Sequence, residues 1–107
     1  MALRRSIAEP RGSAVNQAEI DKIAQSLAPD VVRIRYDFNS DWSGEHSIFF
    51  RIVLSDDASR EDRLATVAGR VKNRLLEGLH LLEWDLLPYF NFRSKSEQEE
   101  LQEEAWG

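Results

Sequence analysis

The stretch VVRIRYDF, residues 31–38, decides the fold, because its side chains alternate in character with a period of two. Apolar and charged positions separate onto opposite sides of the extended chain: Val32, Ile34, Tyr36 and Phe38 against Arg33, Arg35 and Asp37. The stretches SIFFRIVL, residues 47–54, and LLPYFNFR, residues 86–93, alternate in the same way. Such apolar faces must pack on helices, so the three stretches are predicted to form one small sheet.

Three helices are predicted around these strands. The first is capped by Asn16, with Glu19 three residues on, and Pro29 ends it; its apolar stripe is Ile20, Ile23, Ala24 and Leu27. The second runs from a cap at Ser59 to about His80, and its buried stripe is Leu64, Val67, Ala68, Val71, Leu75 and Leu79. The third spans residues 95–106, is capped by Ser96, and has as its apolar contacts Leu101, Ala105 and Trp106.

The order of these elements predicts an α+β fold of the order α-β-β-α-β-α. Its single-layer, antiparallel or mixed, three-stranded sheet carries helices on one face, and the first two strands form an antiparallel hairpin. The predicted core combines both periodicities and consists of Val32, Ile34, Phe38, Ile48, Phe50, Ile52, Leu64, Val67, Val71, Leu75 and Phe92.

The 107 residues have the length of one ordinary domain, which we assign to residues 13–107 after a flexible leader at residues 1–12. The composition is that of a folded globular protein, with 42% hydrophobic and 31% charged residues. No apolar stretch approaches the roughly 20 residues that span a bilayer. Residues 1–13 also lack the apolar centre of a secretory signal, so a cytoplasmic location is predicted. The chain has no cysteine, so neither disulfides nor thiolate metal sites are expected.

The formal net charge of −5 is unevenly distributed. Residues 94–107 hold five glutamates and one lysine, so the rest of the chain is near neutral, and its polar sheet face can be locally basic. The candidate binding face consists of arginines, aromatic residues and two tryptophans that could make contacts: Arg33, Arg35, Arg51, Arg93, Phe49, Tyr89, Trp42 and Trp106.

Two interpretations of this face follow from its chemistry. Guanidinium groups bind phosphates and aromatic rings stack on bases, which is typical of a single-stranded nucleic-acid platform. Alternatively, carboxylates of the acidic helix, of a partner protein or of an identical subunit neutralise the arginines. The second interpretation is preferred, because four like charges on one face repel each other and the chain carries its own acidic segment.

The loop from Asp37 to His46 holds a second group of candidate functional side chains. Asp37, Asn39 and Asp41 resemble the opening of a calcium loop, but Trp42 replaces the required glycine and Ile48 replaces the bidentate glutamate. No specific calcium or zinc site is therefore expected, and no cofactor.

The two histidines offer little to a catalytic mechanism. His46, beside Glu45, could act as a general base, but neither a partner nucleophile nor a phosphate-binding glycine loop accompanies it. His80, at a helix end, is expected to contact terminal carbonyls.

The sequence therefore predicts a non-enzymatic interaction or regulatory module. It would bind a partner protein, or a second copy of the chain, through its sheet face and acidic C-terminal helix. A nucleic-acid-binding domain that uses the arginine face is the alternative, and a metal-dependent enzyme centred on the loop is the second alternative. Neither a membrane nor a cofactor enters the prediction.

Overall fold

The structure is a computed structural model that describes residues 15–40, 43–83 and 86–107, the side chain of Leu82 excepted. Its elements follow the predicted order α-β-β-α-β-α. They are α1 (Gln17–Ser26), β1 (Val31–Ser40), β2 (His46–Leu54), α2 (Leu64–Gly78), β3 (Leu87–Ser94) and α3 (Lys95–Leu101), with short 3-10 turns η1 (Leu81–Glu83) and η2 (Glu104–Trp106). The predicted α+β fold is confirmed, whereas the predicted leader, residues 1–12, lies outside the described residues.

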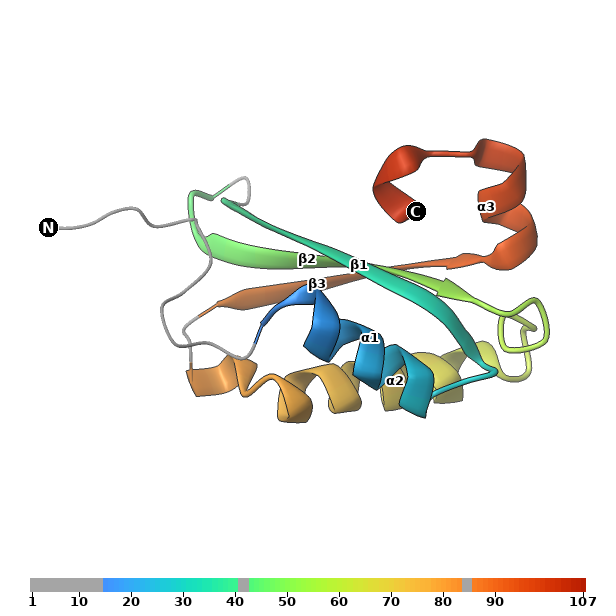
Figure 1. Cartoon of the computed structure of the whole chain (residues 1–107), viewed down its shortest axis with the longest axis horizontal. Coiled ribbons are helices and arrows are strands. Elements are labelled where there is room, and N and C mark those ends of the chain that lie inside the picture. Colours follow the sequence, from blue (N-terminus) through green and yellow to red (C-terminus); the bar gives the residue numbers. More distant parts are fainter. Residues whose placement is uncertain (1–14, 41–42, 84–85) are drawn as a thin grey trace, which may run out of the picture.

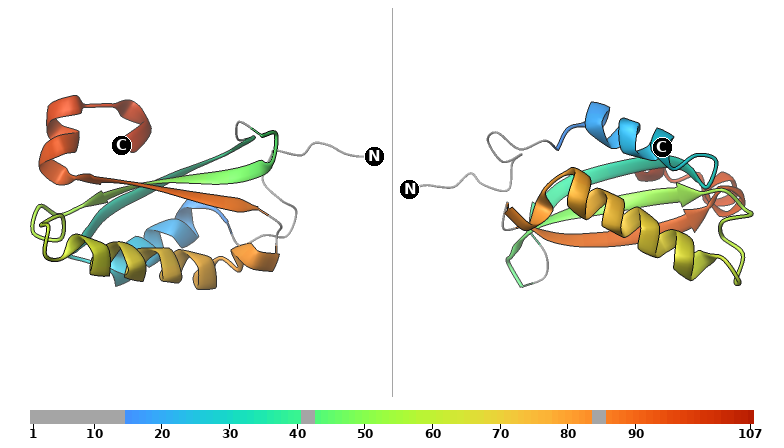
Figure 2. Two further views of the ribbon diagram at one scale, coloured as in Figure 1. Left: turned by 180° about the vertical axis from the view of Figure 1, so that it is seen from behind. Right: turned by 90° about the horizontal axis from the view of Figure 1, so that it is seen from below.

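The three strands form one mixed sheet in the order β1-β2-β3. β2 is central, because it pairs antiparallel with β1 and parallel with β3. α1 and α2 lie side by side against one face of the sheet, while the chain after β3 turns over the opposite face (Figures 1 and 2). We call the face away from α1 and α2 the outer face, and residues 95–107 the C-terminal segment.

α1 begins and packs as its sequence predicts. The Asn16 side-chain oxygen accepts a hydrogen bond of 2.9 Å from the backbone N–H of Glu19, which satisfies one of the free donors of the first turn. All four residues of the predicted apolar stripe are buried: Ile20, Ile23, Ala24 and Leu27. The packing of this stripe on the sheet holds a helix of only 10 residues, a length that is marginal alone.

α2 begins at Leu64, five residues after the predicted cap, so this prediction was wrong at its start. The reason lies in Ser55, whose hydroxyl oxygen accepts a bond from the N–H of Ala58 and whose carbonyl accepts the Ser59 hydroxyl. These bonds fold the chain after β2 into turns and occupy Ser59. Leu64, predicted as a core residue, is the first residue of the helix, is 39% exposed and does not join the core.

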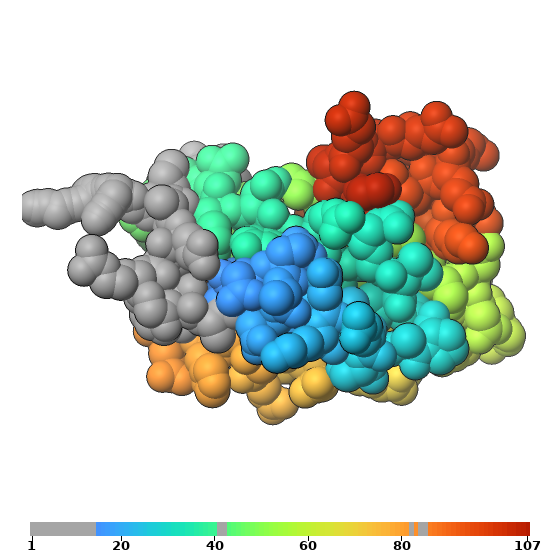
Figure 3. Space-filling view, viewed as in Figure 1, coloured from blue at the N-terminus to red at the C-terminus, as the bar shows by residue number. Residues whose placement is uncertain are grey.

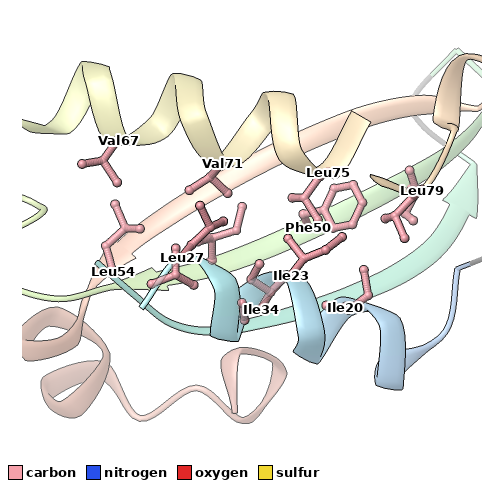
Figure 4. Close-up of a cluster of buried hydrophobic side chains, with 14 of the residues drawn as sticks. Ile20, Ile23, Leu27, Ile34, Phe50, Leu54, Val67, Val71, Leu75 and Leu79 are labelled. Carbon is pink, nitrogen blue, oxygen red and sulfur yellow. The ribbon is translucent and has the colours of Figure 1, made fainter. Parts of the chain in front are cut away.

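The hydrophobic core fills the space between the sheet and the two helices (Figure 4). Phe50 lies at its centre, below α2, and is fully buried. Of the predicted core residues, the buried ones are Ile34, Ile48, Phe50, Ile52, Val67, Val71 and Leu75. Phe38 and Phe92 are half-buried and pack against this cluster.

A β-bulge at the start of β1 overturns one further core prediction. Val31 pairs with Leu54 and Arg33 pairs with Val53, so Val32 is an extra residue without a counterpart on β2. The extra residue reverses the alternation at this point. Val31 is therefore buried in the core, and Val32, predicted to lie there, is 41% exposed.

The C-terminal segment does not form the single predicted helix over residues 95–106. α3 is capped by Ser94, whose hydroxyl accepts a bond of 3.0 Å from the N–H of Glu97. It ends at Leu101, because Gln102 adopts a left-handed conformation with φ of 51°, and the 3-10 turn η2 follows. Leu101 and Ala105, predicted as apolar contacts of this helix, are exposed as a result of the break.

Candidate binding face

Strand register places the outer-face side chains in rows that cross the sheet, and three of these rows hold the arginines and the aromatic residues of the predicted binding face. Each row takes one residue from each strand, because β2 pairs with both neighbours. Asp37, Phe49 and Tyr89 form the first row, Arg35, Arg51 and Asn91 the second, and Arg33, Val53 and Arg93 the third. The structure thus brings together all four arginines of the predicted binding face with Phe49 and Tyr89.

The third row lies beneath the C-terminal segment. Val53 points away from α1 and α2 and yet is fully buried, and η2 lies against β2 at this point. The Arg93 guanidinium stands over the indole of Trp106 at 4.2 Å from the ring centroid, a cation–π contact. Trp106 is only 9% exposed, so the predicted terminal tryptophan has a docking place on its own sheet.

Polar contacts join Arg93 and Arg33 to the C-terminal segment. Arg93 Nη1 donates to the side-chain oxygen of Gln98 at 2.9 Å, and its Nη2 forms an ion pair with Glu103. Arg33 Nε donates to the backbone carbonyl of Trp106, also at 2.9 Å. The C-terminal segment covers this end of the outer face in Figure 3 and in the left view of Figure 2. An intramolecular carboxylate therefore neutralises Arg93.

Two like charges face each other in the second row. Arg35 lies directly opposite Arg51 across the β1–β2 ladder, an arrangement that is unfavourable between adjacent strands. Arg51 forms an ion pair with Asp37, one row away on the same face. Among the described residues, no ion pair or side-chain hydrogen bond engages Arg35, which is half-buried.

The first row carries an aromatic pair. The rings of Phe49 and Tyr89 stack with their centroids 4.9 Å apart and their planes at 11°. Both side chains are half-buried, and the C-terminal segment lies at the other end of the face. Trp42, predicted as a contact residue of this face, lies outside the described residues.

Asp56 fixes the place where the C-terminal segment leaves the sheet. Its carboxylate accepts bonds from the hydroxyl and, at 2.9 Å, from the backbone N–H of Ser96. These two hydrogen bonds hold the pKa of Asp56 below its ordinary value of 3.8. Ser96, predicted as the cap of the last helix, therefore lies inside α3 and connects it to the chain that follows β2.

Two residues of the sequence that resembles a calcium loop have other contacts in the structure. Asp37 is engaged by Arg51, and Ile48 is fully buried on the core side of the sheet. His46 is exposed at the start of β2, and Asp41 lies outside the described residues. Over the described ranges, no group of three or more His, Asp and Glu side chains could hold a metal ion.

His80 differs from its prediction. It has a positive φ of 53° just after α2, and its Nδ1 lies 3.2 Å from a carboxylate oxygen of Glu83. The side chain thus contacts a carboxylate of η1, whereas the backbone N–H of His80 reaches the carbonyl of Glu77. This exposed pair has no nucleophile in its described contacts.

Gln98 is the site residue that sequence reasoning missed. It is 5% exposed, and its amide accepts from Arg93 and donates to the backbone carbonyl of Glu103 at 2.8 Å. Its only signal in the sequence was its place beside the glutamates of the acidic segment, where a polar residue is expected to face solvent. Its two hydrogen bonds place the amide between Arg93 and the backbone of Glu103, where the chain folds back after α3.

Comparisons with known proteins add no relative to this description: no family model, no curated protein and no solved structure matches the chain. The assignment of a function must therefore come from the outer face itself. In the part of the chain that the structure describes, no helix has both the length and the apolar character needed to cross a membrane.

Proposed function

We propose that this protein is a small non-enzymatic interaction module of the cytoplasm that binds an acidic polypeptide segment on the outer face of its sheet. The segment would belong to a partner protein or to a second copy of the chain. One observation carries the proposal: the arginines of this face already bind polypeptide groups. Arg33 holds a backbone carbonyl, and Arg93 holds a side-chain amide and a carboxylate.

Arg35 supplies the anchoring charge for such a partner. It faces Arg51 across the ladder, and only Arg51 has a carboxylate partner among the described residues. A carboxylate from outside would relieve this like-charge pair, and a guanidinium can bind it in bidentate fashion. The side chain lies between the covered third row and the aromatic first row, so an incoming segment could use both Arg35 and the Phe49–Tyr89 pair.

A second copy of the chain offers suitable chemistry. The C-terminal segment exposes Glu97, Glu99, Glu100 and Glu104, which its own sheet does not bury. Acidic groups on one molecule are complementary to Arg35 on another, for which the described residues supply no carboxylate, and such complementarity favours encounter and sets the register of a complex. Association would also cover the half-buried aromatic pair.

Single-stranded nucleic acid is the second candidate ligand. The stacked rings of Phe49 and Tyr89 beside Arg51 favour it, because aromatic platforms next to cations bind bases and phosphates. Against it, Arg51 and Arg93 are paired with carboxylates of the chain itself. A phosphate would have to displace these groups.

Charge reversal at Arg35 tests the proposal. Sedimentation of the full chain over a range of concentrations should show association that Arg35→Glu weakens. Lys22→Glu on α1, on the other side of the sheet, is the matched control, since it changes the net charge equally and should leave association intact.

Fluorescence anisotropy with labelled single-stranded RNA gives the opposing test. Weak binding without sequence preference is expected. Tight RNA binding that falls steeply with added salt, and that Arg35→Glu abolishes, would contradict the proposal and support the nucleic-acid alternative.

A further inference from the structure

We propose that Arg33, Val53 and Arg93 form a recognition site for a polypeptide segment that carries a glutamate three residues before a tryptophan. In the isolated chain, Glu103 and Trp106 fill this site as an internal ligand. The inference rests on the proposed function, because it names the sequence chemistry of one segment that the outer face would accept. It concerns the third row of the face, whereas Arg35 belongs to the second.

Arg93 contacts both the glutamate and the tryptophan of such a segment. Its Nη2 pairs with the Glu103 carboxylate, while the central carbon of the same guanidinium lies over the Trp106 indole. A 3-10 turn sets this spacing, because the N–H of Trp106 bonds the carbonyl of Glu103 at 3.1 Å and brings the two side chains to one side. A single arginine can therefore select for both residues and for the three-residue separation between them.

Val53 and Arg33 complete the site. Val53 gives an apolar floor that is fully buried although it lies outside the main core cluster. Arg33 binds the backbone carbonyl of the tryptophan, a contact that any residue at this position of a ligand could offer. The site thus combines one backbone contact with two side-chain contacts, and the side-chain contacts carry the selectivity.

The C-terminal segment, which supplies the internal ligand, has few buried side chains. Within residues 95–107, only Gln98 and Trp106 are buried. An open hollow of ≈ 380 Å³ lies between Arg33 and the segment, with Gln102 and Glu104 on its wall. Segments with few buried contacts open locally at a small fraction of the global unfolding free energy.

The end of α3 at Gln102 separates residues 103–107, which can detach from the sheet, from the helix that stays in place. Asp56 and Ser94 hold the first turn of α3, whereas residues 103–107 follow the left-handed residue and have Trp106 as their only buried side chain. Opening of these five residues would expose Val53, Arg33 and Arg93 and leave α3 in place. A segment in trans must compete with a tethered one, whose effective concentration is about millimolar for a short linker.

The test uses the full chain carrying Trp106→Ala and a fluorescein-labelled peptide of residues 95–107. The variant removes the indole from the site and so weakens the tethered segment as a competitor. The peptide should therefore bind the variant saturably and about tenfold or more tightly than it binds the wild type. Leu101→Ala in the full chain is the matched control. Leu101 is 48% exposed, and its loss should leave the site closed to the peptide.

Further measurements show whether the binding is specific. A peptide with alanine in place of the tryptophan should not bind the Trp106→Ala chain, and the double variant Trp106→Ala with Arg93→Ala should lose the intact peptide. Circular dichroism and thermal unfolding establish that each variant is folded. Glu103→Gln, a milder change that removes only the ion pair, should admit the peptide to an intermediate degree.

Failure of the peptide to bind the folded Trp106→Ala chain, or binding that survives Arg93→Ala, would overturn this inference. Neither result touches the test of the proposed function, which measures the effect of Arg35→Glu on association. A chain that associates through Arg35 and ignores the peptide would retain the proposed function and lose the recognition site. The two failures are therefore distinguishable.

Discussion

Phe50 of β2 stacks on Phe90 of β3, with ring centroids 5.4 Å apart and planes at 14°. The two residues pair in the parallel ladder, so one contact joins the centre of the core to the edge strand. Phe50 is fully buried, whereas Phe90 is half-buried. The Nζ of Lys72 on α2 lies over the Phe90 ring, 5.8 Å from its centroid. The sheet, its edge and α2 therefore share one aromatic stack.

Phe50→Ala should lower the free energy of unfolding by on the order of 3–5 kcal/mol, because it removes this stack and leaves a cavity under α2. Chemical denaturation would measure the change. Val32→Ala is the control, since Val32 is 41% exposed and its truncation should cost less than about 0.5 kcal/mol. Equal losses for the two variants would show that the two faces of the sheet are misassigned.

Gly69→Ala should raise the free energy of unfolding by about 0.5–1 kcal/mol, because alanine stabilises the interior of a helix relative to glycine. The added methyl group at this position of α2 meets no atom within 4 Å. Gly78→Ala gives the comparison, since its methyl group would lie 3.0 Å from Cδ1 of Ile23 on α1. Thermal unfolding should place Gly69→Ala above the wild type and Gly78→Ala below Gly69→Ala.

Acid should release the C-terminal segment from the chain after β2. Hydrogen bonds from Ser96 lower the pKa of Asp56 below 3.8, so its carboxylate stabilises the fold above that pH. The stabilisation should be lost as the pH falls below 3.8 through the folded-state pKa. A carbon-detected NMR titration of the Asp56 carboxyl would measure this pKa.

Ser96→Ala provides the control for that titration. It removes the larger cause of the shift, so the pKa of Asp56 should rise toward 3.8. The pKa of Asp57, which Arg63 and Arg60 lower, should stay where it was. An unchanged Asp56 in the variant would contradict the assignment of the shift to Ser96.

Gln98→Ala should loosen the C-terminal segment without unfolding the core. The change removes a partner from Arg93 and from the carbonyl of Glu103, and unsatisfied polar groups of this kind cost about 1–3 kcal/mol. Hydrogen exchange should accelerate in residues 98–107 and stay slow in β2. Glu100→Ala, at an exposed position of α3, should leave both regions unchanged.

Calcium should not bind specifically to the loop between β1 and β2. Asp37 is engaged by Arg51, and the position that requires a bidentate glutamate holds the buried Ile48. Calorimetric titration with calcium should give no saturable heat. A micromolar signal that Asp41→Ala abolishes would contradict this prediction and revive the metal-dependent alternative.

The period-two and helical patterns predicted most of the fold, because both patterns indicate which side chains are buried. The hairpin, the stripe of α1 and the centre of α2 follow from residues such as Ile34, Ile23 and Val71, which are all buried. The patterns did not predict where α2 begins. Ser59 looks like a cap in the sequence, but its hydroxyl bonds the Ser55 carbonyl, a turn that depends on where β2 ends in space.

The sequence predicted which residues lie on the outer face, but it did not predict which of them contact each other. Alternation alone placed Arg33, Arg51 and Arg93 on one face, and register then set them in rows. Which arginine is paired depends on the path of the chain after β3. Gln102 turns that path, and its left-handed conformation has no signal in a stretch that otherwise favours a continuous helix.

The bulge at Val32 has a consequence for how this chain can vary. Two consecutive valines stand where the ladder shifts by one residue, and either of them could supply the apolar side chain that meets Leu54. Loss of Val32 would join Val31 to Arg33 in a regular ladder and keep every later side chain on its face. Homologous sequences can therefore carry a one-residue gap here, at the head of β1. A gap anywhere from Ile34 to Phe38 would instead shift the residues before it by one position and turn their side chains to the opposite face of the sheet.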